Sequence, residues 1–117
     1  MKINTDLDTH WVVMRVSPRA SQHGGMIEEI TFANSDYEIA YTYVDRDNNN
    51  YTRWRDIIDL HNRGCGIIVN GLRKKRNSQH KRTGAPLINA DSPVTIRHVE
   101  LHQQTVLDAL VEQLETV

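Results

Sequence analysis

The stretch "YEIAYTYV", residues 37–44, decides the fold of this chain. Tyr37, Ile39, Tyr41 and Tyr43 recur at every second position, which is the period of a β-strand and not of a helix. Tyrosine and isoleucine also favour strands, because their side chains fit a pleated surface. The stretch therefore predicts a strand, and the neighbouring segments should supply its partners in a sheet.

Two further strands are expected before this stretch. Residues 26–33, "MIEEITFA", place Ile30 and Phe32 on one side of a strand, and the short connection "NSD" predicts a hairpin with the tyrosine-rich strand. Residues 10–16, "HWVVMRV", are rich in β-branched and aromatic residues, and this strand is expected to stop at the Ser-Pro pair of residues 17–18.

The period of the apolar residues changes after the polar turn "DRDNNN". In residues 51–64, "YTRWRDIIDLHNRG", apolar residues recur at helical spacing, and Gly64 follows where a C-terminal cap would sit. This pattern predicts a short amphipathic helix with one inward-facing stripe, formed by Trp54, Ile57, Ile58 and His61.

The second half of the chain adds strands and one more helix. Residues 66–72, "GIIVNGL", form an apolar run that is too short for an ordinary helix and predicts a buried strand. A basic loop runs from there to Pro86, and "PLINADSPVTIRHV" offers two short strands. A C-terminal helix is predicted from a stripe formed by Leu107, Leu110, Val111 and Leu114.

This order of elements predicts an α+β fold. The expected architecture is a small antiparallel sheet, or a partly open β-barrel, with one short central helix and a C-terminal helix. We expect residues 1–117 to form a single domain, because that length is enough for one core. The C-terminal helix could either cover the sheet or pair with another copy of the chain to form a homo-oligomer.

The amino-acid composition indicates the expected cellular location. The 117 residues contain one cysteine, Cys65, so no disulfide can form within the chain, and a cytoplasmic location is expected. The N-terminal residues do not resemble a signal sequence, and no apolar run approaches the roughly 20 residues needed to cross a bilayer. We therefore expect no membrane partner.

Charge is unevenly distributed along the chain. The net charge is −1, yet residues 60–90 contain seven basic residues and no acidic ones, while the rest holds seven basic and all fifteen acidic residues. Six of the basic residues lie within residues 73–82. Segregation of this kind creates a positive region able to attract an anion, and the acidic remainder discourages indiscriminate binding.

The basic loop is the first candidate site. Arginine can grip phosphate oxygens in a bidentate fork and lysine can act as a point charge, so the loop offers both chemistries. Gly71 and Gly84 would let the backbone turn sharply at its two ends. The competing interpretation is a solvated loop that only keeps the protein soluble. The candidate ligand-binding residues here are Arg73, Lys74, Lys75, Arg76, Lys81 and Arg82.

Arg53 and Arg55 form a second candidate site on either side of Trp54. A guanidinium plane can stack on a base or grip a phosphate. The competing interpretation places Trp54 in the core and pairs the two arginines with Asp56 and Asp59.

The sequence gives little support for a metal site or a catalytic site. Residues 45–56 match a calcium loop only in part, since Asn50 stands where a glycine is needed, and an Asx-rich turn explains the same residues. The spacing of His98 and His102 is not a zinc signature, and Cys65 between two glycines is more typical of a small filler than of a nucleophile. We therefore expect no metal, no cofactor, no catalytic residue and no enzymatic activity.

Three short motifs carry a resemblance to a known group of proteins. They are "SDYEI" at residues 35–39, a central tryptophan ahead of a "GIIV" strand, and "DSPVTI" at residues 91–96. Over about half of the chain, this pattern resembles small β-rich accessory proteins of bacteriophages. The resemblance implies a protein that works by binding a host factor, a nucleic acid or a defence signal, without catalysis.

These observations lead to two functional hypotheses. The first is a phage-type binding protein that captures a small phosphate-containing ligand, such as a nucleotide-derived signal, between the basic loop and the arginines near Trp54, and so sequesters it to counter host defence. The alternative is a nucleic-acid or host-protein interaction module that uses residues 73–82.

Overall fold

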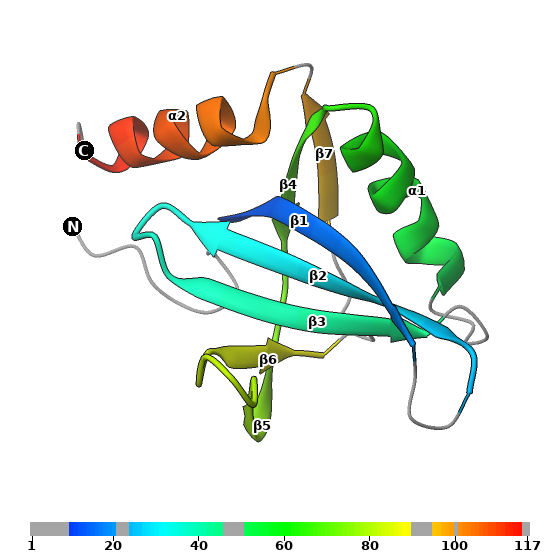
Figure 1. Ribbon diagram of the computed structural model, residues 1–117. Helices are drawn as coiled ribbons and strands as arrows, with labels where there is room; N and C mark the ends of the chain where they lie inside the picture. The colour runs from blue at the N-terminus through cyan, green and yellow to red at the C-terminus, as the bar shows by residue number, and fades with distance from the viewer. Residues whose placement is uncertain (1–9, 21–23, 46–50, 90–94, 100, 116–117) are drawn as a thin grey trace.

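The computed structural model describes residues 10–20, 24–45, 51–89, 95–99 and 101–115, with side chains left undescribed at residues 51–53, 95–99 and 113–115 (Figure 1). Its elements follow the order β-β-β-α-β-β-β-β-α. They are β1 (His10–Ala20), β2 (Met26–Asn34), β3 (Ile39–Asp45), α1 (Tyr51–Asn62), β4 (Gly66–Asn70), β5 (Lys74–Gln79), β6 (Pro86–Ile88), β7 (Thr95–Val99) and α2 (Gln103–Glu115).

In the described residues, the strands form one open sheet in the order β5-β6-β3-β2-β1-β4-β7. Neighbouring strands are antiparallel except β3 and β6, which run parallel and meet at Tyr41 and Leu87. The Thr42 hydroxyl reinforces this contact by donating a 2.8 Å hydrogen bond to the Ile88 carbonyl. The α+β prediction with two helices is confirmed, and the sheet is open and mixed.

Helix α1 covers one face of the sheet. Its Trp54 and Ile57 are fully buried against Phe32 of β2 and the apolar residues of β1 and β4. The rings of Phe32 and Trp54 meet edge to face, with centroids 5.9 Å apart. This is the geometry that aromatic pairs prefer, so Trp54 is a core residue, as the helical spacing predicts.

Helix α2 covers part of the opposite face. Val106 and Leu107 pack on Val12, Ala33 and Ile68, which point away from the α1 side of the same strands. The two helices therefore lie on opposite faces of the sheet, because neighbouring residues along a strand face opposite ways. Of the predicted stripe, Leu107 is buried against the sheet and Leu110 packs beside it, while the side chain of Leu114 lies outside the described residues.

The end of α1 confirms the predicted cap. Gly64 has a φ of 85°, its amide donates to the His61 carbonyl, and the Cys65 amide donates to the Leu60 carbonyl. These two bonds form a Schellman motif, in which glycine adopts the left-handed conformation at low cost.

Three local predictions were wrong. Strand β1 continues through Pro18 to Ala20, because β4 pairs only with His10 to Val12 and a missing amide is tolerated where β1 is an edge. Tyr37 lies in the β2–β3 turn with a φ of 59° and is not a strand residue. The basic segment is not a plain loop, since residues 74–79 form strand β5.

No helix among the described residues is both long enough and apolar enough to cross a membrane.

Candidate functional site

The basic segment folds into an ordered hairpin at one edge of the sheet. We call β5, the following turn and β6 the cationic hairpin, residues 74–88. The backbone has a positive φ of 91° at Gly71, just before the hairpin, and of 75° at Gly84, within its turn, which agrees with the sharp turns predicted at these glycines. Its exposed cations are Lys74, Lys75, Arg76, Lys81 and Arg82.

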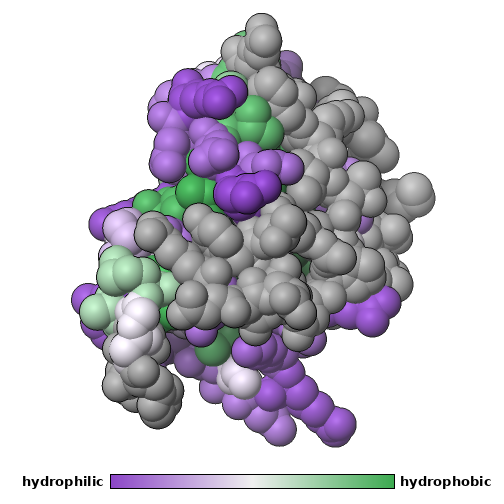
Figure 2. Space-filling model, turned by 90° about the vertical axis from the view of Figure 1, so that its right-hand side faces the viewer, coloured by the Kyte–Doolittle hydropathy of each residue, from purple (hydrophilic) through white to green (hydrophobic). Residues whose placement is uncertain are grey.

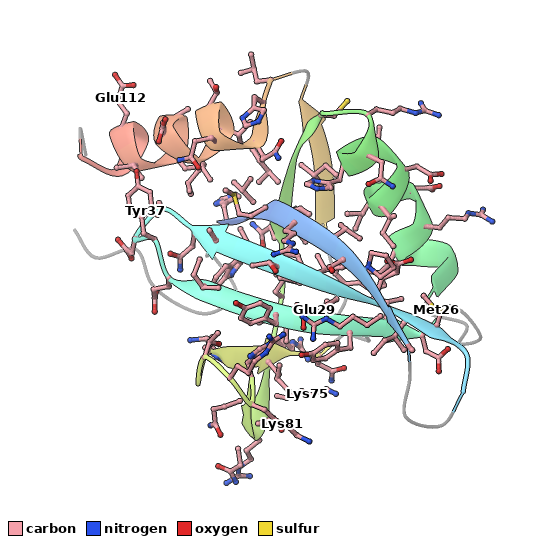
Figure 3. The ribbon with its side chains drawn as sticks, viewed as in Figure 1. Met26, Glu29, Tyr37, Lys75, Lys81 and Glu112 are labelled. Carbon is pink, nitrogen blue, oxygen red and sulfur yellow. The ribbon has the colours of Figure 1, made fainter. Side chains whose placement is uncertain are left out.

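The hairpin projects away from the two helices. In Figure 1, β5 lies below the sheet, on the side away from α1 and α2. Figure 2 shows hydrophilic side chains extending as a finger at the same lower end of the molecule. Figure 3 shows Lys75 and Lys81 on this finger, with Glu29 above them in the sheet. The cations are therefore held out towards solvent.

Strand β5 bulges away from β6. Lys74 pairs with Ile88 and Gln79 pairs with Pro86, so five steps along β5 match only two along β6. The longer stretch of β5 between these two pairs includes Asn77, whose φ is 55°, a conformation that asparagine tolerates better than most residues. The bulge carries Lys75 and Arg76 outward.

His80 organises the turn that follows β5. Its amide donates a 2.7 Å bond to the Ala85 carbonyl, and its carbonyl accepts from the Gly84 amide at 2.9 Å. Its Nδ1 accepts from the amides of Arg82 and Thr83, at 3.2 and 3.3 Å. The side chain therefore caps the turn from within and fixes the positions of Lys81 and Arg82.

The same histidine anchors the turn to the sheet. Its Nε2 lies 3.3 Å from Oε2 of Glu29, a buried carboxylate on β2. The Tyr43 hydroxyl donates to the same oxygen at 2.9 Å, and Nη2 of Arg19 lies 3.2 Å from Oε1. We call Arg19, Glu29, Tyr43 and His80 the Glu29 clamp. A buried carboxylate needs such partners to offset its lost hydration.

Aromatic packing reinforces this clamp. The ring of Tyr41 lies against that of His80 with centroids 4.2 Å apart, and the Tyr43 ring is nearly parallel to it at 6.5 Å. Tyr41 and Tyr43 lie on the same face of β3, as their two-residue spacing predicts. This is also the face that α2 covers further along the sheet.

The clamp changes the acidity of its tyrosine. Burial, together with the hydrogen bond and the negative charge of Glu29, raises the pKa of Tyr43 from 10.0 to about 12. The positive charges of Arg19 and Arg82 act in the opposite direction.

Both ring nitrogens of His80 are occupied. Because Nδ1 accepts two backbone amides, the proton of the neutral ring lies on Nε2 and is donated to Glu29. Acting as a general base would require His80 to release the turn. The Glu-His pair is thus suited to positioning the hairpin.

The structure brings most of the predicted cations together but leaves the α1 arginines elsewhere. Arg73 comes just before β5, and its carbonyl accepts from the Asn89 amide at 2.8 Å. Arg55 is exposed on α1, and Figure 1 shows that α1 and β5 lie apart. The side chain of Arg53 lies outside the described residues. We therefore build the candidate site on the hairpin and leave the α1 arginines out of it.

The predicted pairing of Arg55 with Asp56 or Asp59 is not seen in the described part of the chain. Nor, within that part, does a carboxylate form an ion pair with any of the five exposed hairpin cations. Their charge is therefore available to an outside anion.

The residues of the Glu29 clamp were missed from the sequence. Arg19, Glu29 and Tyr43 carry no motif, and His80 has no informative spacing to another histidine. One feature of the sequence could have indicated the role of His80. It lies inside a basic segment that has no apolar residue to pack into the core. Its importance depends on the strand register that places Glu29 beside Tyr43.

No family model matches the chain, and neither a curated protein nor a solved structure matches it significantly.

Proposed function

We propose that this chain is a non-enzymatic binding protein that holds phosphate groups on its cationic hairpin, and that these phosphates belong to the backbone of a nucleic acid. The observation that carries the proposal is the set of five exposed cations on an ordered hairpin, with no carboxylate paired to them among the described residues. A backbone already held in a hairpin loses less conformational entropy on binding than the backbone of a mobile loop.

Exposure favours a polymer over an enclosed small molecule. Pockets for small ligands are concave and bury most of the ligand surface. The hairpin cations project outward instead, which suits an extended chain of phosphates. The acidic remainder of the molecule would repel the same polymer and so orient it towards the hairpin.

The small-ligand hypothesis stays a prediction. In that version, the hairpin would sequester a nucleotide-derived signal, in keeping with the resemblance to phage accessory proteins and with a role against host defence. A homo-oligomer formed through α2 also stays a prediction. Occupied nitrogens on His80 and a half-buried Cys65 give no support to a catalytic role.

Salt dependence tests the proposal. We would measure the affinity of the protein for a short fluorescein-labelled DNA by anisotropy across a range of sodium chloride concentrations. Contact of about four phosphates predicts that log affinity falls with log salt at a slope of about −3 to −4.

A second arm addresses the small ligand. Native mass spectrometry on protein purified from cells would report a retained nucleotide and the subunit count. A flat salt dependence together with a retained nucleotide at fixed stoichiometry would contradict the nucleic-acid proposal and favour the small ligand.

A further inference from the structure

Strand β5 is exposed on both of its faces. Of its six residues only Ser78 is half-buried, whereas β1 to β4 each hold several buried residues. A strand inside a sheet hides at least one face against a core. Strand β5 therefore has two faces free to meet a partner.

The exposed side chains of β5 include groups that recognise bases as well as groups that bind phosphates. Arg76 offers a bidentate fork, and Asn77 and Gln79 each offer a donor NH₂ group and an acceptor carbonyl oxygen. Arginine with guanine, and asparagine or glutamine with adenine, are the pairings that geometry favours at base edges. Lys74 and Lys75 add charge beside them.

The aromatic residues nearest the hairpin are poorly placed to stack on single-stranded bases. Proteins that bind single strands present open aromatic faces as stacking platforms. Here Tyr41 already lies against His80, and Tyr43, although 37% exposed, is one ring held by its hydroxyl to Glu29 and stacked towards His80, so it does not form a row of open faces. The site is therefore better suited to a duplex than to a single strand.

We propose that β5 and its turn enter the major groove of double-stranded DNA, an inference that rests on the nucleic-acid function proposed above. The major groove of B-form DNA is about 12 Å wide and admits a two-stranded β-ribbon, whereas that of A-form RNA is too narrow and deep for side chains to read. Lysines and arginines contact the phosphates along the groove, and Asn77 and Gln79, which are two positions apart on β5, face the base edges.

The test compares nucleic acids of one sequence by fluorescence anisotropy. The probes are a DNA duplex, its separate strands, the matching RNA duplex, and a DNA duplex whose cytosines carry glucosylated hydroxymethyl groups that fill the major groove. The plain DNA duplex is expected to bind about tenfold more tightly than each other probe. Distamycin, which occupies the minor groove, should leave this affinity unchanged.

A matched pair of variants tests the base-reading role. Gln79→Ala should weaken binding to a sequence selected from a random duplex pool and leave the salt slope unchanged, because no charge is lost. Gln104→Ala removes an exposed glutamine from α2 and should change neither quantity. Asn77→Gly provides a second check, because glycine keeps the positive φ while removing the amide.

Two results would overturn the inference. One is equal or tighter binding of the single strand, and the other is undiminished binding of the glucosylated duplex. Either result, with binding still lost when the hairpin cations are removed, would leave the phosphate-binding function standing. Failure of every nucleic-acid probe to bind would instead remove the proposed function itself.

Discussion

At the residue scale, the position of the hairpin depends on the hydrogen-bond and ion-pair partners of one buried carboxylate. Glu29 is buried and accepts from Tyr43 and His80, with Arg19 beside it. A buried carboxylate is stable only with such partners, and in turn it gives the hairpin a fixed point of attachment. The order of a polar hairpin can thus be traced to a few side chains.

The histidine in this cluster should show a defined tautomer. The hydrogen bonds predict that His80 carries its proton on Nε2, which long-range ¹H–¹⁵N correlation spectra report directly. His80→Ala should destabilise the fold by about 1–3 kcal/mol, because the amides of Arg82 and Thr83 lose their acceptor and Glu29 loses a donor.

Two further substitutions separate these contacts. His80→Asn can retain the acceptor near Nδ1, and His80→Gln can retain the donor near Nε2. Each should therefore cost less than His80→Ala in urea denaturation. A proton on Nδ1, or equal stability of all three variants and the wild type, would contradict the clamp.

Tyr43 gives the clamp a signature in pH. Because its pKa is raised from 10.0 to about 12 in the fold, the neutral phenol stabilises the native state fully below pH 10, and this contribution disappears as the pH rises through about 12. Spectrophotometric titration should show a late tyrosine ionisation that Tyr43→Phe removes. If the variant loses an ionisation of ordinary midpoint instead, Tyr43 does not contact Glu29 in solution.

At the element scale, the sequence predicts apolar elements well and polar ones poorly. The sequence predicts strand β4 and helix α1 because their buried residues are apolar and are spaced as a strand or a helix requires. These residues include Ile67 and Val69 in β4, and Trp54 and Ile57 in α1. For the residues of β5, the sequence pattern indicates a loop, because none of them is apolar. Its order comes from the Glu29 clamp and from pairing with β6, which are non-local contacts that no window of sequence contains.

The core position of Trp54 can be tested at this scale. Trp54→Ala should lower the free energy of unfolding by about 3–5 kcal/mol, because it leaves a large cavity against Phe32. Urea denaturation measures the loss. The exposed neighbour Arg55 serves as the control, since Arg55→Ala should shift stability by about 0.5 kcal/mol or less. Similar stabilities of the two variants would mean that α1 does not pack as described.

At the scale of the whole molecule, basic and acidic residues are separated along the chain. Half of the fourteen basic residues fall within residues 60–90, where there are no acidic ones, and five of them are exposed on one projecting hairpin. The sequence was enough to identify this segment and its chemistry. It could not show that α1, the helix that carries Arg55, lies apart from the hairpin, since that depends on how α1 crosses the sheet.

The position of a positive charge should matter for binding as well as its presence. The double variants Lys75→Ala/Arg76→Ala on the hairpin and Arg55→Ala/Arg63→Ala on and after α1 each remove two exposed positive charges. If net charge alone decided the affinity for DNA, both double variants would lose the same amount. If the hairpin is the binding site, only the hairpin variant should lose affinity.

The most direct measurement is therefore the affinity of these two variants for the same labelled DNA duplex, with thermal melting to confirm that both remain folded. The hairpin variant should bind about tenfold or more weakly, and its salt slope should fall by about 2, because two phosphate contacts are lost. The α1 variant should bind like the wild type. Equal losses in both, or full affinity in the hairpin variant, would contradict the claim that the clamped hairpin is the binding site.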